Sequence, residues 1–236
     1  MAAEKVENPL VSVIIPTYNA AHFVGRAIES ALSQSLVPDE IIVIDDGSTD
    51  NTAAIVKSYG DRVNYQYQPN HGASVARNNG IAIAKNDIIA LLDADDYWPV
   101  DKLERQTRLL QDNPTTDLVW GLVKIEYAHQ GLERFVSLEK APDDIAPIPC
   151  LGAALFRRRA FEKVGMFDEK LYLSEDWDWY NRVHEKKVNI LKDRSTSLHY
   201  CRHDHNLTKD IRVLAQDQLY FLKRTIDRRR QNNYYK

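Results

Sequence analysis

Short apolar runs that alternate with helical stretches constrain the fold of this chain more than any other feature. Strands are predicted at Val11–Ile15, Glu40–Ile44, Val63–Tyr67 and Ile88–Leu92. Helices are predicted at Ala20–Ser33, from the capping residues Ser48–Asp50 to about Tyr59, and at Ser74–Ala84. Apolar strands that alternate with helices are typical of a mostly parallel sheet covered on both faces. The sequence therefore predicts an α/β fold whose ligands bind at the carboxyl ends of the strands.

The pattern changes after Trp98. Further strands are predicted at Leu118–Tyr127 and Val188–Leu191, and further helices at Asp101–Gln111, Glu175–Lys186 and Lys209 to about Arg230. The segment Ala141–Pro149 is rich in Pro and Asp and is predicted to be a loop. With 236 residues and 44% hydrophobic content, the chain is large enough for one domain with an extensive core.

Composition excludes several classes of protein. A net charge of -3 provides no basic surplus for a nucleic-acid partner. The two cysteines, Cys150 and Cys201, form neither a disulfide framework nor a metal-binding spacing. Met1–Leu10 lacks the apolar segment of a signal peptide, and no stretch approaches the length of a membrane span. We therefore expect a cytoplasmic protein, with at most a peripheral contact to a membrane.

Three carboxylates follow the fourth predicted strand within four residues, namely Asp93, Asp95 and Asp96. In an extended chain the side chains of Asp93 and Asp95 leave on the same side, where their charges repel each other. A divalent cation would relieve that repulsion and could bridge the carboxylates to a substrate phosphate. The alternative is an ordinary acidic turn after a strand.

Polar residues also follow the first strand, and an arginine lies in the third helix. Thr17 and Asn19 offer hydrogen-bonding groups at the carboxyl edge of the sheet, and Tyr18 could cover a planar base. Arg77 falls in an otherwise apolar helical stretch. It is either a surface residue or a planar donor that reaches the acidic loops or a phosphate.

The second strand ends in Asp45 and Asp46. Either carboxylate could accept hydrogen bonds from a base edge or a ribose. The alternative role is to cap the next helix, but Ser48 and Asp50 can do this without them. This redundancy favours a ligand-binding role for the aspartate pair.

Taken in order and spacing, these segments resemble family 2 glycosyltransferases of GT-A fold. The matching segments are Val13–Asn19, Ile44–Asp50, Gly72–Asn78, Leu92–Asp96, Phe156–Arg158, Gly165–Glu169 and Ser174–Asp178. Each motif is short, but the ordered set is specific. The resemblance implies a mostly parallel, Rossmann-like sheet flanked by helices, with a C-terminal helix, in a single domain of residues 1–236.

The resemblance also implies roles for individual residues. Those that would bind the nucleotide sugar are Thr17, Tyr18, Asn19, Asp46, Arg77 and Asp93, with Asp45 as the alternative to Asp46. Asp95 and Asp93, the two acids of an Asp-x-Asp motif, would hold Mn²⁺ or Mg²⁺. A histidine near residue 203 would join the metal or contact the diphosphate; His203 matches best, and His199 and His205 are the alternatives.

Asp176 would be the catalytic base, because the Glu175–Asp176 pair matches the family's acidic pair and Asp176 is the better match. The dipole of the helix that starts here favours its charge, whereas Glu175 and Asp178 oppose it. Glu175 and Trp177 could contribute to an acceptor site. Of Trp177 and Trp179, one is expected to pack in the core.

We therefore predict metal-dependent transfer of a sugar from a UDP-sugar to a hydroxyl group, inverting and by single displacement. The acceptor would be a saccharide or a lipid-linked molecule in cell-surface polysaccharide or glycan synthesis. Residues 8–98 would form the half that binds the nucleotide sugar, 117–208 the acceptor-binding half, and 209–236 the C-terminal helix. Sugar, acceptor and oligomeric state are left open, and an oligomer is compatible with the sequence.

Three other functions are compatible with parts of the sequence. A nucleotidyltransferase usually has a Gly-rich first loop, whereas this chain has Pro16–Asn19 there. A protein that only binds a nucleotide sugar would not need both Asp95 and Asp176. A scaffolding protein could use the terminal helix, whose basic end either is solvated or rests on an anionic membrane surface.

Overall fold

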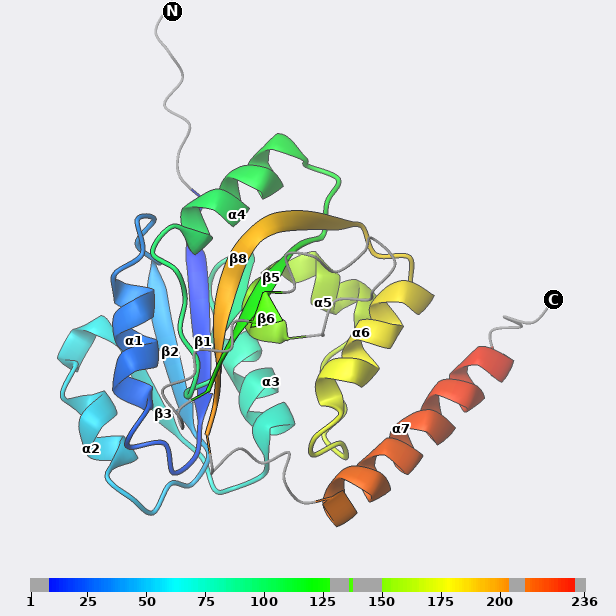
Figure 1. Ribbon diagram of the computed structural model, residues 1–236, viewed down its shortest axis with the longest axis horizontal. Helices are drawn as coiled ribbons and strands as arrows, with labels where there is room; N and C mark the ends of the chain where they lie inside the picture. Colours follow the sequence, from blue (N-terminus) through cyan, green and yellow to red (C-terminus); the bar gives the residue numbers. More distant parts are fainter. Residues whose placement is uncertain (1–8, 128–135, 138–149, 204–210, 232–236) are drawn as a thin grey trace, which may run out of the picture.

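The computed structural model describes residues 9–127, 136–137, 150–203 and 211–231 (Figure 1). Its strands are β1 (Val11–Thr17), β2 (Glu40–Asp45), β3 (Asn64–Tyr67), β4 (Ile88–Leu91), β5 (Leu118–Tyr127), β6 (Val136–Ser137), β7 (Ala154–Arg157) and β8 (Ile190–Arg202). Its α-helices are α1 (Val24–Leu32), α2 (Thr52–Lys57), α3 (Ala73–Ile83), α4 (Lys102–Asp112), α5 (Arg158–Val164), α6 (Glu175–Glu185) and α7 (Ile211–Gln231). Short 3₁₀ turns lie at Gly60–Arg62 and Leu151–Ala153.

One eight-stranded sheet runs through the molecule in the order β3-β2-β1-β4-β7-β5-β6, and β8 pairs with β5. The pairings β1–β2, β1–β4, β2–β3 and β5–β8 are parallel, whereas β7 and β6 pair antiparallel with their neighbours. Helices flank this sheet, so the predicted α/β fold with a mostly parallel sheet is confirmed.

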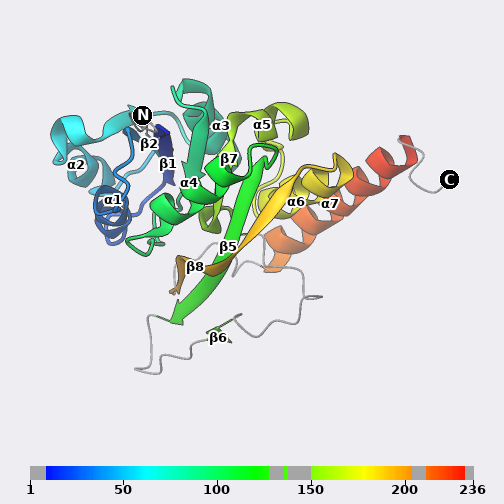
Figure 2. The ribbon, with the colours of Figure 1, turned by 90° about the horizontal axis from the view of Figure 1, so that it is seen from above.

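The first four strands form the parallel half, and their order explains how the helices cover it. The chain crosses from β1 to β2 in one direction along the sheet and from β3 to β4 in the other. Because such crossovers are right-handed, α1 and α3 lie on opposite faces, as Figure 2 shows. Strands β1, β2 and β4 are buried on both faces, which accounts for their continuously apolar sequences.

The second half differs from the sequence-based expectation. The elements β6, β7 and α5 were not predicted, and the short strand predicted at Val188–Leu191 only overlaps the start of the much longer β8. The sequence of β8 includes the polar stretch Lys192–Ser197, which reads as a loop when taken alone. Its extended conformation comes from pairing with β5, which continues through two register shifts.

Two other predicted segments are only partly tested. Ala141–Pro149 and the predicted first residues of the last helix, Lys209 and Asp210, lie outside the described residues. From Ile211 the helix is present as α7, which lies at the edge of the molecule beyond α6 (Figures 1 and 2). None of the helices in the described part combines the length and the apolar character that a membrane crossing requires.

Helix α3 packs so closely on β1 that Gly80 has no space for a side chain. A methyl group at Gly80 would overlap the Cγ2 atom of Ile14, whereas one at Gly25 in α1 would meet only ordinary contacts, the nearest at 3.6 Å. We expect Gly80→Ala to lower the free energy of unfolding by about 2 kcal/mol through overpacking. The control Gly25→Ala should leave it unchanged or raise it by about 0.5 kcal/mol through helix propensity. Urea unfolding measures both; equal effects would contradict the close α3–β1 packing.

Candidate active site

The predicted site residues gather at the carboxyl edge of the parallel half, where the loops after β1, β2 and β4 meet the start of α6 and the end of β8. This edge includes the point at which β1 has β2 on one side and β4 on the other. Such a reversal of strand order opens a crevice between the loops of an α/β sheet. In this chain, acids from several segments meet at that position, where such a crevice is expected.

Arg77 is the centre of this site. Its side chain is buried, with Nη2 2.7 Å from Asp93 Oδ1 and Nη1 2.6 Å from Glu175 Oε1. Nη1 also lies 3.8 Å from Asp176 Oδ1. Burial alone would lower the pKa of Arg77, but the three carboxylates raise it well above its usual value. The surface position considered from the sequence is therefore wrong, and Arg77 does reach one of the acidic loops.

Asp176 and Glu175 occupy the first turn of α6 but differ in their surroundings. Glu175 pairs directly with Arg77 through Oε1, whereas Asp176 Oδ1 lies 3.8 Å from the guanidinium. Glu175 Oε2 and Asp176 Oδ1 are both buried without a hydrogen-bond partner among the described residues. The Asp176 side chain is 24% exposed and that of Glu175 only 9%. Asp176 is thus the more accessible of the two carboxylates.

The pKa of Asp176 is raised well above its usual value. Burial is the largest cause, and the neighbouring charges of Glu175 and Asp93 add to it, while Arg77 acts in the opposite direction. The expected contribution of Asp178 is not found. Its carboxylate instead lies 2.8 Å from both Arg182 Nε and Arg228 Nη1, which compensate its charge.

Asp95 and His203 approach each other across the edge of the sheet. His203 Nε2 lies 3.1 Å from Asp95 Oδ2, and the imidazole stacks on Phe23 with ring centroids 4.2 Å apart. Burial and the charge of Asp93 raise the pKa of Asp95, and His203 partly offsets this.

The other two candidate histidines are placed differently. His199 Nδ1 lies 2.8 Å from Glu126 Oε1, and its ring stacks on Tyr97 at 4.4 Å. His205 lies outside the described residues. Of the two described histidines, only His203 is brought beside the acidic loop.

Asp96 is a structural residue of the site whose role the sequence analysis did not identify. Its Oδ1 accepts a hydrogen bond of 2.8 Å from the backbone N–H of Cys201, which ties the acidic loop to β8. Burial and the charges of Asp95 and Asp93 raise its pKa well above the usual value. The only signal in the sequence was that a third acid follows the two expected to hold a metal. Its partner, Cys201, is 105 residues away and could not be found from spacing.

The loop after β1 is held by Asn19, whose backbone has φ +47°. Its Oδ1 accepts hydrogen bonds from the backbone N–H groups of Thr49 and Asp50 at 2.8 and 3.3 Å. Asn19 therefore joins two loops. Tyr18 is 47% exposed, and the buried hydroxyl of Thr17 has no hydrogen-bond partner among the described residues.

Asp46 also organises a loop. Oδ1 accepts hydrogen bonds from the Gln68 side chain at 2.7 Å and the His71 N–H at 2.9 Å, and Oδ2 accepts one from the Gly72 N–H at 2.8 Å. Asp45 accepts from the Ser48 N–H and the Tyr65 hydroxyl at 2.8 and 2.7 Å.

The two tryptophans beside Asp176 separate as expected. Trp179 is fully buried and donates from Nε1 to the Gly165 carbonyl at 2.9 Å. Trp177 is 46% exposed and directly follows Asp176 in the sequence. The expectation that one of the two packs in the core is confirmed.

Within the described residues, no three His, Cys, Asp or Glu side chains converge as a complete metal site. Asp95 and His203 nevertheless place a carboxylate oxygen and an imidazole nitrogen side by side. Mg²⁺ and similar cations commonly take only one or two protein ligands and complete their shell with substrate phosphates and water. This pair of donors fits such a partial site.

Comparison with known proteins gives concordant matches. Residues 12–165 match the family model described as glycosyl transferase family 2. An uncharacterised glycosyltransferase of Rickettsia prowazekii is 36% identical over 191 residues, which cover 75% of this chain and 59% of that protein. TuaG of Bacillus subtilis, whose name assigns it to teichuronic acid biosynthesis, is 42% identical over 132 residues, covering 54% of this chain and 52% of that protein. This chain thus spans between half and three fifths of each relative.

Among solved structures, S. aureus TarS in complex with UDP-GlcNAc superimposes with a TM-score of 0.65 at 20% identity. The superposition covers 85% of this chain and 61% of that chain. This similarity confirms the predicted GT-A fold.

The carboxylates around Arg77 should depend on its charge. We expect Arg77→Met to lower the free energy of unfolding by about 3 kcal/mol at pH 8, because the buried Glu175 loses the cation with which it pairs at 2.6 Å. At pH 5 the deficit should shrink, because protonation removes the repulsion among carboxylates whose pKa values rise when Arg77 is absent. Denaturant unfolding at both values measures this.

The control for this prediction is Arg108→Met, which removes a largely exposed i,i+4 pair with Glu104. We expect a change of less than about 0.5 kcal/mol that does not depend on pH in this way. An Arg77→Met deficit that is equally large at pH 5 and pH 8 would contradict an electrostatic role for Arg77.

Proposed function

The chain belongs to glycosyl transferase family 2, and from this we propose that it transfers a sugar from a UDP-sugar to a hydroxyl group of a saccharide or a lipid-linked acceptor. The observation that carries the proposal is the ion-pair fork of Arg77. It joins Asp93, at the end of a strand in the predicted nucleotide half, to Glu175, beside Asp176 in the predicted acceptor half. This supports the proposal, because it holds a residue predicted for the donor site close to the predicted base.

Several features support a nucleotide at this edge. The TarS structure of similar fold was solved with UDP-GlcNAc. In this chain Tyr18 offers an exposed ring, and Thr17 offers a hydroxyl that has no partner among the described residues, beside the loop that Asp46 organises. Asn19 and Asp46 would act here by shaping the loops, because their side-chain oxygens already accept hydrogen bonds from the protein. A direct contact to the nucleoside would use the remaining lone pairs of these oxygens.

Asp95 and His203, with Asp93 nearby, would hold Mn²⁺ or Mg²⁺ together with the diphosphate. When bound, the cation would stabilise the negative charge that grows on the leaving diphosphate. The protein's own contribution is to fix the two donors. His203 is held by its stacking on Phe23, and the Asp95 carbonyl accepts a hydrogen bond of 2.8 Å from Arg26.

Asp176 would act as the general base. Its raised pKa makes the carboxylate a stronger proton acceptor than an ordinary aspartate. It would take the proton from the acceptor hydroxyl as that oxygen bonds to the anomeric carbon and the bond from this carbon to the diphosphate breaks. A base without a protein nucleophile suits single displacement with inversion of configuration.

The acceptor side would include Glu175 and Trp177. The exposed Trp177 ring could stack on a sugar, since aromatic faces cover apolar faces of such rings. The name of TuaG supports a role in building a cell-surface polysaccharide.

The donor assignment is tested by thermal unfolding of the full chain with nucleoside diphosphates, with Mn²⁺, Mg²⁺ or a chelator present. We expect UDP to raise the apparent stability in the presence of metal, by about 2.7 kcal/mol at a hundredfold excess over its dissociation constant. No shift with any nucleotide would contradict a nucleotide-sugar site.

Asp176→Asn separates the base from the donor site. We expect it to keep UDP binding within about twofold and to lower UDP release from UDP-sugars by about a hundredfold or more, because proton transfer is lost. The control Asp61→Asn changes an exposed acid and should alter neither. Normal turnover in Asp176→Asn would overturn the base assignment. If the wild type binds UDP but transfers no sugar, the chain would instead be a binding protein.

Asp95→Asn and His203→Ala test the metal site. We expect both to weaken metal-dependent UDP binding by about tenfold and to leave the metal-independent part unchanged, as measured by calorimetric titration with and without chelator. Unchanged binding of UDP and Mn²⁺ in both variants would place the cation elsewhere.

A further inference from the structure

Helix α7 docks on the rest of the molecule through a polar face. Asp217 is buried and accepts hydrogen bonds of 2.8 and 2.9 Å from the backbone N–H groups of Tyr172 and Leu173. Arg228 lies 2.8 Å from Asp178 Oδ1 and 3.0 Å from Glu185 Oε2. Among the described side chains of α7, these contacts to the rest of the molecule are ionic and hydrogen-bonded.

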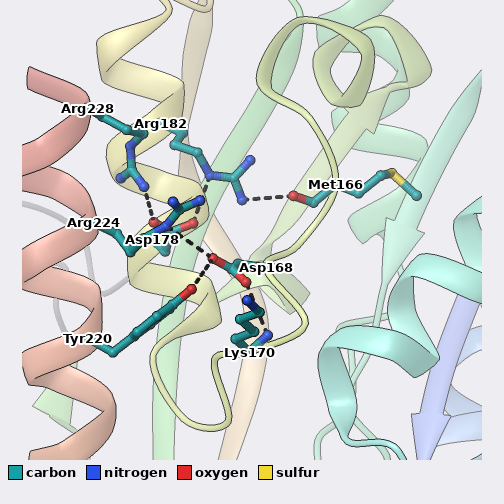
Figure 3. A pocket seen from close by; sticks show the side chains of 8 residues that line it. All are labelled: Met166, Asp168, Lys170, Asp178, Arg182, Tyr220, Arg224 and Arg228. Atoms are coloured by element: carbon teal, nitrogen blue, oxygen red, sulfur yellow. Dashed lines mark hydrogen bonds and ion pairs between the residues drawn. The ribbon is translucent and has the colours of Figure 1, made fainter. Parts of the chain in front are cut away.

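A cavity of about 300 Å³ lies at this inner interface, as Figure 3 shows. It is lined by Met166, Asp168, Lys170, Asp178, Arg182, Tyr220, Arg224 and Arg228. All of its lining residues except Met166 are polar or charged, and Tyr220 donates to Asp168 at 3.4 Å across it. None of the residues predicted for the active site lines this cavity.

The opposite face of α7 is apolar and exposed. Leu219, Leu222 and Ile226 are 69%, 51% and 44% exposed. Their spacing of three and four residues places them in one stripe along the helix. A helix of a soluble domain normally buries such a stripe and exposes its polar face, whereas α7 does the reverse.

Basic residues share this outer face. Lys223 and Arg230 are exposed, and lie four and eleven residues after Leu219, on the same side of the helix. The acids of α7 are placed elsewhere: Asp217 faces inward, and Asp227 is half-buried. The exposed stripe is therefore apolar and positively charged.

We propose that the outer face of α7, defined by Leu219, Leu222, Lys223, Ile226 and Arg230, rests on an anionic membrane surface. An interfacial helix places apolar side chains against the acyl chains and places neighbouring lysine and arginine side chains against anionic headgroups. The lysine and arginine stems are long enough to lie along the apolar stripe while their charges reach the headgroups.

A second copy of the chain fits this face less well. A parallel symmetric pairing of two α7 stripes would bring Lys223 and Arg230 against the same positive residues. A stable protein interface also buries about 800 Å² on each partner. Three aliphatic side chains supply only a small part of that area.

Co-sedimentation of the full chain with vesicles tests the proposal. We expect pelleting with vesicles that contain roughly a third phosphatidylglycerol, and little with pure phosphatidylcholine. Leu219→Gln/Leu222→Gln/Ile226→Gln should lower the partition coefficient at least tenfold. Lys223→Glu/Arg230→Glu should lower it about 25-fold or more, because each basic residue near an anionic surface contributes about a fivefold factor.

Matched controls change exposed residues elsewhere. Val37→Gln/Val100→Gln replaces two exposed aliphatic side chains, and Lys192→Glu/Arg194→Glu reverses two exposed charges on β8. Both should bind vesicles like the wild type, and circular dichroism should show all four variants folded.

Three results would overturn the proposal. They are equal pelleting with neutral and anionic vesicles, equal losses in the control variants, and no pelleting of the wild type. Sedimentation equilibrium adds a further test: a dimer that the apolar triple variant converts to a monomer would assign the face to self-association instead.

Discussion

The buried guanidinium of Arg77 is the interaction on which the site depends. A planar fork with donors in two directions can satisfy two carboxylates at once, which a lysine could not do with the same geometry. It therefore holds the end of β4, through Asp93, against the start of α6, through Glu175. Helix α3 can supply this arginine because Gly80 lets α3 lie directly on β1. The close packing of α3 on β1 is therefore also what places the charge of Arg77.

Around Arg77, the acids divide into those that build the crevice and those left to act in it. Asp46 and Asp96 each accept backbone hydrogen bonds that fix a loop, and Glu175 is committed to Arg77. Asp176 and Glu175 each keep one buried oxygen without a partner among the described residues, but Asp176 lies 3.8 Å from the guanidinium instead of 2.6 Å, and its side chain is 24% exposed against 9% for Glu175. This division supports Asp176, rather than Glu175, as the group that meets the substrate.

The sequence predicted what is local and missed what depends on distant pairing. Apolar runs and helix spacing identified β1, β2 and β4 and the helices near them, because burial on both faces leaves a strong signal in each of these strands. Arg77 was found as an arginine in an apolar helix, but its partners in α6 could not be read from spacing. β8 was largely missed because its polar stretch is extended only through β5, and with it the hydrogen bond of Asp96 to Cys201 was missed.

The balance of charge in the crevice bears on what it can bind. Asp93, Glu175 and Asp176 lie around the buried Arg77, and Asp95 and Asp96 follow Asp93 in the same loop. Burial raises the pKa values of Asp95, Asp96 and Asp176. A nucleoside diphosphate is itself anionic, so its approach to these carboxylates would add to the repulsion. The proposed cation between Asp95, His203 and the diphosphate would resolve this conflict. Its two positive charges would attract both the carboxylates of the protein and the phosphates of the substrate. In this proposal the acidic loop binds an anionic ligand only because one cation bridges the loop and the ligand.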